Sequence, residues 1–250
     1  MHAGNSSEWL TGGFHPSWSG CLDASAVSLL AAIEREVGPG CYPEPVRVLR
    51  FLSTDVSALK VVILGQDPYP SAGAATGRAF EVGSLTAWTE PFRQVSLKNI
   101  LRLLWCVAHG IRPYERETEY ERIPAFSGIR EAIRKGAFPV ASPRSLFQSW
   151  EEQGVLLLNT SLTVEPGNPG SHRDLWAPFT QHALSWLATA RPDLCWFLWG
   201  SHAQAHREWL GDARIFASRH PMLCSVTYPD DFLKNPCFHE TSGGINWLGS

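Results

Sequence analysis

Four short apolar runs in this sequence each end at a side chain or turn that can take part in chemistry. The first run, Val61–Gly65, is followed by Asp67 and Tyr69 on a turn that two prolines stiffen. A carboxylate held in this way can orient a water molecule or stabilise a nearby cation. Equivalent positions after the other three runs (155–158, 195–199 and 213–217) hold Asn159, the pair Gly200 and Ser201, and His220.

Each of these residues also has an ordinary structural explanation. Asp67 and Asn159 are common turn formers, and a lone histidine such as His220 is often structural. Phe80, in the segment GRAF, reads by itself as a core residue. The chemical interpretation therefore depends on whether the elements that carry these residues bring them together.

The pattern of elements predicts that they do meet. Apolar strands at 61–64, 155–158, 195–199 and 213–217 alternate with helical patterns at 97–109, 179–190 and 203–210, and an earlier helix begins after Asp23. We therefore expect an α/β fold, with a central four-stranded parallel, or mostly parallel, sheet and helices on both faces. Ligands of such sheets bind beyond the carboxyl ends of the strands, where all four segments end.

Length and composition favour one domain over residues 1–250, with an irregular N-terminal segment at 1–20. The net charge of −3 provides no overall basic field and counts mildly against a nucleic-acid partner. The six scattered cysteines are typical of free thiols in a reducing compartment. The sequence contains no apolar run long enough to span a membrane and no secretory signal pattern, so we expect an intracellular location.

Several familiar motifs are absent or incomplete. His202 and His206 have the i, i+4 spacing of metal ligands, but no HExxH motif and no third ligand accompany them, so we expect no metal. No glycine-rich phosphate loop or GxSxG motif occurs. The charged run at 114–122 is typical of a solvated face.

Taken together in chain order, the motifs resemble those of the family 1 uracil-DNA glycosylases. The resemblance covers most of the chain, and its two longest motifs are VVILGQDPYP (61–70) and GVLLLNTSLTVEPGNPGSH (154–172). Shorter matches are HPSW (15–18), CYPEP (41–45), GRAFEV (77–82), SLKNI (96–100), FLWGSHAQ (197–204), SRHPMLCSV (218–226) and INW (245–247).

The resemblance implies a role for each pocket residue. A target uracil flipped out of DNA would stack on Phe80, and Asn159 would read its N3 and O4 edge. Tyr69 would fill the space beside C5, where thymine carries a methyl group, and Gln66 would contact the base through its backbone. The catalytic pair would be Asp67, which stabilises the sugar cation and positions water, and His220, which hydrogen-bonds O2 of the departing base.

The same resemblance implies DNA contacts and identifies departures from the family pattern. Phosphate contacts fall to Ser96, Gly200, Ser201 and Ser225. The leucine that enters the DNA stack aligns with Cys224, and Leu223 could replace it if the loop shifts by one residue. Pro70 stands where most cellular members have histidine, although poxvirus members also have proline. The segment 89–96 keeps one proline of a usually proline-rich loop, and 112–149 is longer than expected and is interpreted as an insertion.

The sequence therefore predicts a base-excision repair enzyme that hydrolyses the glycosidic bond of uracil in DNA without metal or organic cofactor. Its expected partner is uracil-containing DNA, with a DNA-mimicking inhibitor protein as a further candidate; we expect a monomer that does not bind membranes. The location would be cytoplasmic in a bacterium and nuclear in a eukaryote or virus. Alternatives are a DNA-binding or replication-accessory protein with weak catalysis, a nucleosidase, and a glycosylase for a 5-substituted uracil.

Overall fold

One four-stranded sheet forms the centre of the computed structural model, which describes residues 7–249. All three strand pairings are parallel, and the order is β2-β1-β3-β4. The predicted α/β class, the parallel sheet and its helical covering are confirmed. The strands are β1 (Val61–Gly65), β2 (Val155–Asn159), β3 (Cys195–Trp199) and β4 (Arg214–Ser218).

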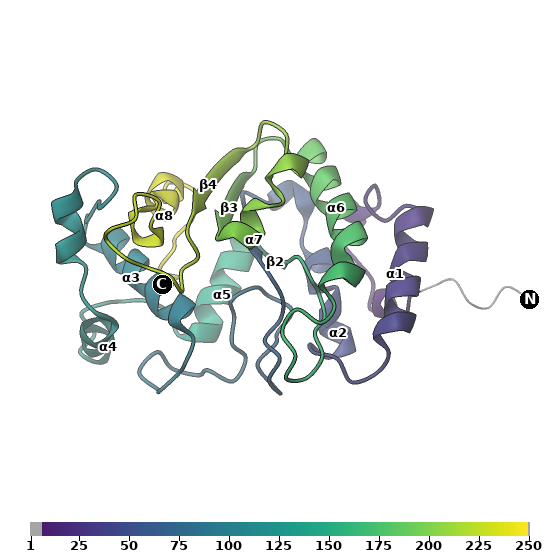
Figure 1. Cartoon of the computed structure of the whole chain (residues 1–250), viewed down its shortest axis with the longest axis horizontal. Helices are drawn as coiled ribbons and strands as arrows, with labels where there is room; N and C mark the ends of the chain where they lie inside the picture. Colours follow the sequence, from purple (N-terminus) through teal and green to yellow (C-terminus); the bar gives the residue numbers. More distant parts are fainter. Residues whose placement is uncertain (1–6, 250) are drawn as a thin grey trace, which may run out of the picture.

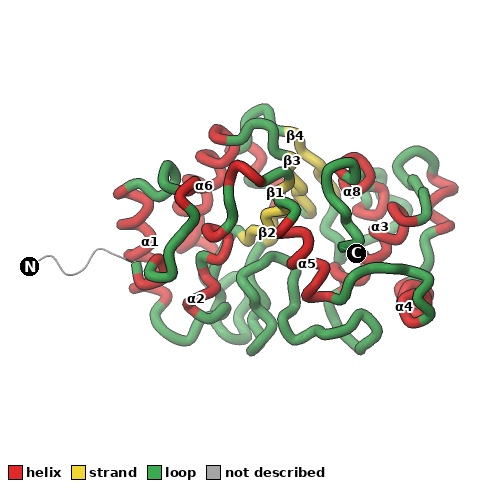
Figure 2. Tube along the Cα trace, turned by 180° about the vertical axis from the view of Figure 1, so that it is seen from behind, coloured by secondary structure: helices red, strands yellow, loops and turns green. Residues whose placement is uncertain are grey.

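Helices cover both faces of this sheet. In Figure 1, α1 and α6 lie on one side of the strands and α3, α5 and α8 on the other, and Figure 2 shows the strands enclosed between these helices from behind. The helices are α1 (Ala24–Val37), α2 (Pro45–Val48), α3 (Val95–Ala108), α4 (Phe126–Arg134), α5 (Pro143–Glu152), α6 (Arg173–Ala190), α7 (Ser201–Gln204) and α8 (Cys237–Thr241).

Alternation along the strands divides the buried side chains between two cores. Val61 and Ile63 of β1 pack with α3, α5 and α8, whereas Val62 and Leu64 pack with α1 and α6. Because both faces of the strands are covered, their sequences are continuous apolar runs rather than alternating ones. This burial fixes the register of the strands, and hence the positions of the residues that follow them.

Two helix predictions were wrong at their boundaries. The helix expected at 179–190 begins at Arg173 and continues through Pro178, because the buried Trp176 anchors its first turn by donating Nε1–H to Thr163 Oγ1 at 2.7 Å. The helix expected at 203–210 is instead α7 followed by a 3₁₀ turn at Arg207–Trp209. That turn brings Trp209 and Leu210 onto the core shared with α6.

The segment 112–149 is folded onto the rest of the protein. It contains a 3₁₀ helix (Glu117–Arg122), all of α4 and the first half of α5, and its Ile129 and Phe138 are buried in the core beside α3. In Figure 1, α4 lies beyond α3, at the opposite end of the molecule from the N-terminus.

Three further features bear on the sequence predictions. Residues 7–20 form two short 3₁₀ helices, Glu8–Leu10 and Pro16–Trp18, within the segment expected to be irregular; residues 1–6 of that segment lie outside the described part. All six cysteines are free thiols. Among the helices of residues 7–249, none combines the length and the hydropathy needed to cross a bilayer.

Candidate active site

A single cavity at the carboxyl end of the sheet gathers the residues predicted for the pocket. Its volume is about 290 Å³, and it lies where β1 separates β2 from β3, the switch point of the parallel sheet. The convergence expected from the strand ends is therefore found. The lining includes Gln66, Asp67, Tyr69, Phe80, Ser96, Asn159 and His220.

The turn that carries Asp67 is fixed from two neighbouring segments. Thr160 Oγ1 and the Ser161 backbone N–H both donate to the Gln66 carbonyl, each at 2.9 Å. Asp67 Oδ2 accepts the Gly170 N–H at 2.7 Å. The carboxylate is thus oriented by the loop that follows β2, and its second oxygen makes no hydrogen bond with residues 7–249.

Gly65 creates the space that the Asn159 side chain occupies. A Cβ atom at Gly65 would lie 2.3 Å from Asn159 Oδ1 and 2.8 Å from the Ala79 Cβ. The Asn159 side chain is buried, and its amide has no hydrogen-bond partner among residues 7–249. Neither amide atom of Asn159 is among the fully buried unpaired polar atoms of residues 7–249, so the amide is open to the cavity. The pocket therefore presents one donor and one acceptor to a molecule that enters it.

Two aromatic residues, Phe80 and Tyr69, line the pocket, and the backbone of Phe80 is strained. Phe80 has a φ of +65°, a left-handed conformation that is rare for a bulky residue. Its ring centroid lies 5.5 Å from that of Trp199 and 6.4 Å from that of His220. Tyr69 donates its hydroxyl to the Phe80 carbonyl at 3.4 Å, and burial raises the pKa of the Tyr69 phenol. These contacts place two aromatic rings against the same cavity.

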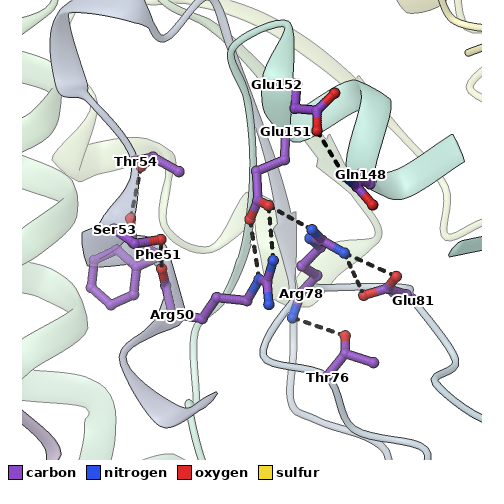
Figure 3. A network of polar contacts seen from close by, with 10 residues as sticks. All are labelled: Arg50, Phe51, Ser53, Thr54, Thr76, Arg78, Glu81, Gln148, Glu151 and Glu152. Atoms are coloured by element: carbon purple, nitrogen blue, oxygen red, sulfur yellow. Dashed lines mark hydrogen bonds and ion pairs between the residues drawn. The ribbon is translucent and has the colours of Figure 1, made fainter. Parts of the chain in front are cut away.

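Figure 3 shows an ionic network of Arg50, Arg78, Glu81 and Glu151, in which Arg78 and Glu81 stand on either side of Ala79 and Phe80 in the sequence. Arg78 donates to both carboxylate oxygens of Glu81, at 3.0 and 3.1 Å, and to Glu151 at 2.5 Å. Arg50 donates to the same Glu151 at 3.0 and 3.2 Å. Burial acts to raise the pKa of Glu151, but hydrogen bonds from Arg78 and Arg50 outweigh it, and the pKa is lowered. The network thus ties both ends of the Ala79–Phe80 segment to α5.

The surroundings of His220 favour a neutral imidazole with one defined tautomer. Its Nδ1 accepts the Met222 backbone N–H at 3.2 Å, so the proton of the neutral ring must reside on Nε2. Burial lowers the pKa of His220, which favours the neutral form. A Cβ at Gly200 would lie 2.9 Å from the His220 Cβ, so the glycine allows β3 to approach the ring. His220 is therefore prepared to donate one hydrogen bond through Nε2.

The loop that carries His220 is anchored to α3 and to the 112–149 segment. Asn99 donates to the Pro221 carbonyl at 2.6 Å, and Arg102 joins Asn99 to the Pro124 carbonyl. Further along the loop, Asp231 accepts the Ser225 N–H at 2.6 Å. The hydroxyl of Tyr120, in the 112–149 segment, lies 3.2 Å from the same carboxylate. Sequence reasoning assigned a role to Ser225 but none to Arg102, Tyr120 or Asp231, and only the presence of Asn99 in SLKNI pointed to its part in this contact.

The remaining predicted residues lie outside the cavity lining. Gly200 and Ser201 begin α7, and Ser201 is exposed. Leu223 and Met222 project from the loop with exposed fractions of 53% and 56%. Cys224 instead packs against the core and donates Sγ–H to the Pro221 carbonyl at 3.4 Å.

The two histidines with metal-ligand spacing are explained by packing. His202 Nε2 lies 2.8 Å from Thr160 Oγ1, and the His206 ring packs against Trp209 at 4.8 Å. Burial lowers the pKa of both rings, that of His206 to about 4. Residues 7–249 contain no group of three or more histidine, cysteine or acidic side chains placed to hold a metal ion.

One cavity at the switch point of the parallel sheet thus holds a carboxylate, a side-chain amide, an aromatic ring and an imidazole. Comparison with known proteins specifies the family. Residues 53–239 match the model of the uracil-DNA glycosylase superfamily, and the chain belongs to that family. The family and enzyme class predicted from the sequence motifs are confirmed.

Curated relatives named uracil-DNA glycosylase match over much of the chain. The protein of Azotobacter vinelandii is 36% identical over 77% of this chain and 67% of its own length. The protein of Tropheryma whipplei is 31% identical over 96% and 92%, respectively. Among solved structures, the wild-type UNG of Nitratifractor salsuginis superimposes with a TM-score of 0.68 at 22% identity, covering 95% of this chain and 96% of that one. The mimivirus uracil-DNA glycosylase gives 0.58 at 23% identity, over 83% and 69%.

Proposed function

We propose that this protein removes uracil from DNA by flipping the nucleotide into the cavity and hydrolysing its glycosidic bond, which leaves an abasic site. The observation that carries the proposal is the convergence of Asp67, Phe80, Asn159 and His220 on one cavity of about 290 Å³. Family membership supplies the reaction class, and the convergence supports the roles that the motif resemblance implies for these residues.

Recognition of the base rests on stacking, pairing and exclusion. The uracil ring stacks on Phe80, and the free amide of Asn159 accepts from N3–H and donates to O4. Cytosine presents the opposite pattern at these atoms, so it would leave the buried amide unpaired. Tyr69 occupies the C5 side and excludes the thymine methyl, and the Gln66 backbone, whose carbonyl is fixed by Thr160, holds the pocket wall.

The chemistry follows from charge development. As the bond between C1′ and N1 breaks, its electron pair leaves with the base, and the sugar becomes cationic. His220 Nε2–H donates to O2 of the departing anion, and Asp67 stabilises the cation. Asp67 also orients a water molecule whose oxygen bonds to C1′, with the released proton passing to solvent or to the base.

DNA is held outside the cavity. We assign phosphate contacts to Ser96, Gly200, Ser201 and Ser225 through hydroxyls and backbone N–H groups. Leu223, which is exposed, is favoured over the inward-packed Cys224 as the side chain that enters the base stack. A mimivirus UNG variant has been solved in complex with UGI, and we propose the same exposed loop as the target of such an inhibitor here. We also propose that the chain acts as a monomeric single domain in which 112–149 is an insertion.

The test is uracil release from single- and double-stranded oligonucleotides by wild type, Asp67→Asn, His220→Leu and the exposed control Asp212→Asn. We expect the first two substitutions to lower kcat about 10²- to 10⁴-fold while the control has no effect. Tyr69→Ala should add release of thymine. Binding of DNA without release of uracil or of a 5-substituted uracil would favour the binding-protein alternative, and release from free deoxyuridine would favour a nucleosidase.

A further inference from the structure

A second hollow lies between the 89–96 segment and the added helix α4. Its volume is about 290 Å³, and we call it the α4 hollow. It is formed where the first turn of α3 meets the first two turns of α4, elements that are far apart in the sequence but adjacent in Figure 1. Its lining residues are Glu90, Pro91, Phe92, Lys98, Phe126, Ser127 and Arg130.

The hollow combines aromatic surface with positive charge. Phe92 and Phe126 are half-buried and pack edge to face, with centroids 5.3 Å apart and an interplanar angle of 75°. The Lys98 ammonium lies 5.4 Å from the Phe92 centroid and 5.9 Å from the Phe126 centroid. An aromatic face beside a cation is the arrangement that proteins use to bind single-stranded nucleic acid, with the base on the ring and the phosphate on the cation.

The cations of the hollow are available to a ligand. Neither Lys98 nor Arg130 has a carboxylate within ion-pair distance among residues 7–249. By contrast, Arg134, one turn further along α4, pairs with Glu131. The carboxylate of Glu90, which also lines the hollow, accepts the Thr86 hydroxyl at 2.5 Å. The hollow therefore holds two cations without an ion pair in the described part of the chain and one carboxylate, a net positive charge that can attract a phosphate.

The hollow and the proposed active site each have one lining residue in the first turn of α3. Lys98 and Ser96 both belong to the first turn of α3, and Ser96 lines the cavity that holds Asp67 and His220. The N-cap residue Gln94 makes no side-chain cap, so the first N–H groups of this helix also remain available to an anion. A helix rises about 1.5 Å per residue, so Ser96 and Lys98 are separated by only about 3 Å along the helix axis.

We propose that the α4 hollow is an accessory site for single-stranded DNA, where a base flanking the flipped uracil stacks on Phe126 and its phosphate binds Lys98 and Arg130. This inference builds on the proposed function. It gives the 112–149 segment a role, because Phe126 and Arg130 both lie within it. It also explains how the 89–96 segment can contact DNA although it has only one proline, because Phe92 of this segment forms the site together with α4.

The experiment compares Arg130→Gln, Lys98→Gln and Phe126→Leu with the control Arg134→Gln on the same helix. Binding of a uracil-free single-stranded 15-mer is measured by fluorescence anisotropy from low to moderate salt. We expect each substitution at the hollow to weaken binding about fivefold or more, and each charge substitution to reduce the salt dependence by about one released counterion. The control should bind like wild type. If all four variants bind the 15-mer equally well, the proposal is wrong, even where the variants differ in stability.

A second measurement separates this inference from the proposed activity. Uracil release is followed from the 15-mer and from a uracil trinucleotide too short to fill both sites. The hollow variants should lose kcat/KM on the 15-mer while they keep wild-type turnover of the trinucleotide. If wild type releases no uracil from either substrate, the proposed function fails, yet the binding comparison still decides the role of the hollow. Equal losses on both substrates would refute an accessory site.

Discussion

Replacement of Arg78 by methionine should destabilise the protein far more than the same change at Arg50. The Arg78 and Glu81 side chains are only 8% and 5% exposed, and Glu81 has no other cation within ion-pair distance among residues 7–249. Removing one partner of a buried pair typically costs about 3 to 5 kcal/mol, because the remaining charge is left unpaired. In a protein of this size that corresponds to a fall in Tm of roughly 6 to 20 °C.

Arg50→Met is the matched control. Arg50 is 33% exposed, and Glu151 would keep Arg78 as its partner, so the expected cost is about 1 kcal/mol. The double variant Arg78→Met/Glu81→Leu removes both members of the buried pair and should recover much of the loss. Urea unfolding and thermal melting at neutral pH measure all three variants beside wild type. Similar midpoints for Arg78→Met and Arg50→Met, or a double variant no more stable than Arg78→Met, would refute the reasoning.

The same network should affect the pocket, because Phe80 lies between Arg78 and Glu81 with its φ at +65°. A left-handed backbone at a bulky residue persists only where its surroundings enforce it. We therefore expect Arg78→Met to raise KM for a uracil oligonucleotide more than it lowers kcat, since it loosens stacking without removing a catalytic group. A fall in kcat alone would contradict this view.

Three further predictions concern the pocket and its rim. Gly65→Ala should abolish uracil release at a stability cost of about 1 to 3 kcal/mol, because the new Cβ would lie 2.3 Å from Asn159 Oδ1; activity and melting assays of the folded variant test this. Leu223→Ala should impair release from double-stranded DNA more than from single-stranded DNA, whereas Cys224→Ala, at an inward side chain, should leave that ratio unchanged. Burial lowers the pKa of His220, so its neutral form persists below the ordinary histidine value; the acid limb of kcat/KM against pH should therefore lie below about pH 6.5, and a limb above that pH would contradict the lowered pKa.

The sheet and the cluster at its edge could be predicted because local sequence determines both. Strands covered on both faces are continuous apolar runs, so VVILG and CWFLW are visible without knowledge of their neighbours. Since the carboxyl ends of parallel strands share one edge, Asp67, Asn159 and His220 follow from the strand positions alone. No interaction between distant residues is needed for that step.

The supports of the site could not be predicted because they are long-range. Arg78 meets Glu151 across 73 positions, and Asn99 meets Pro221 across 122. Both contacts involve segments without a clear period, and neither partner carries a local signal for the other. The choice between Leu223 and Cys224 is of the same kind: their neighbouring positions in a loop give no indication of which one packs inward on α3 and α8.

Net charge was a weak guide to DNA binding because it counts charged residues without regard to the ion pairs that they form. The sequence has 21 basic and 24 acidic residues, a balance that suggests weak binding to DNA. In the folded protein, however, arginines such as Arg112, Arg122 and Arg134 are neutralised by glutamates three residues away. Lys98 and Arg130 are not, and both lie beside the first turn of α3, close to the cavity. A protein with a net negative charge can therefore present a local group of unpaired cations, because ion pairs neutralise many of its other basic residues. Such a group is what the proposed contact with a DNA strand requires.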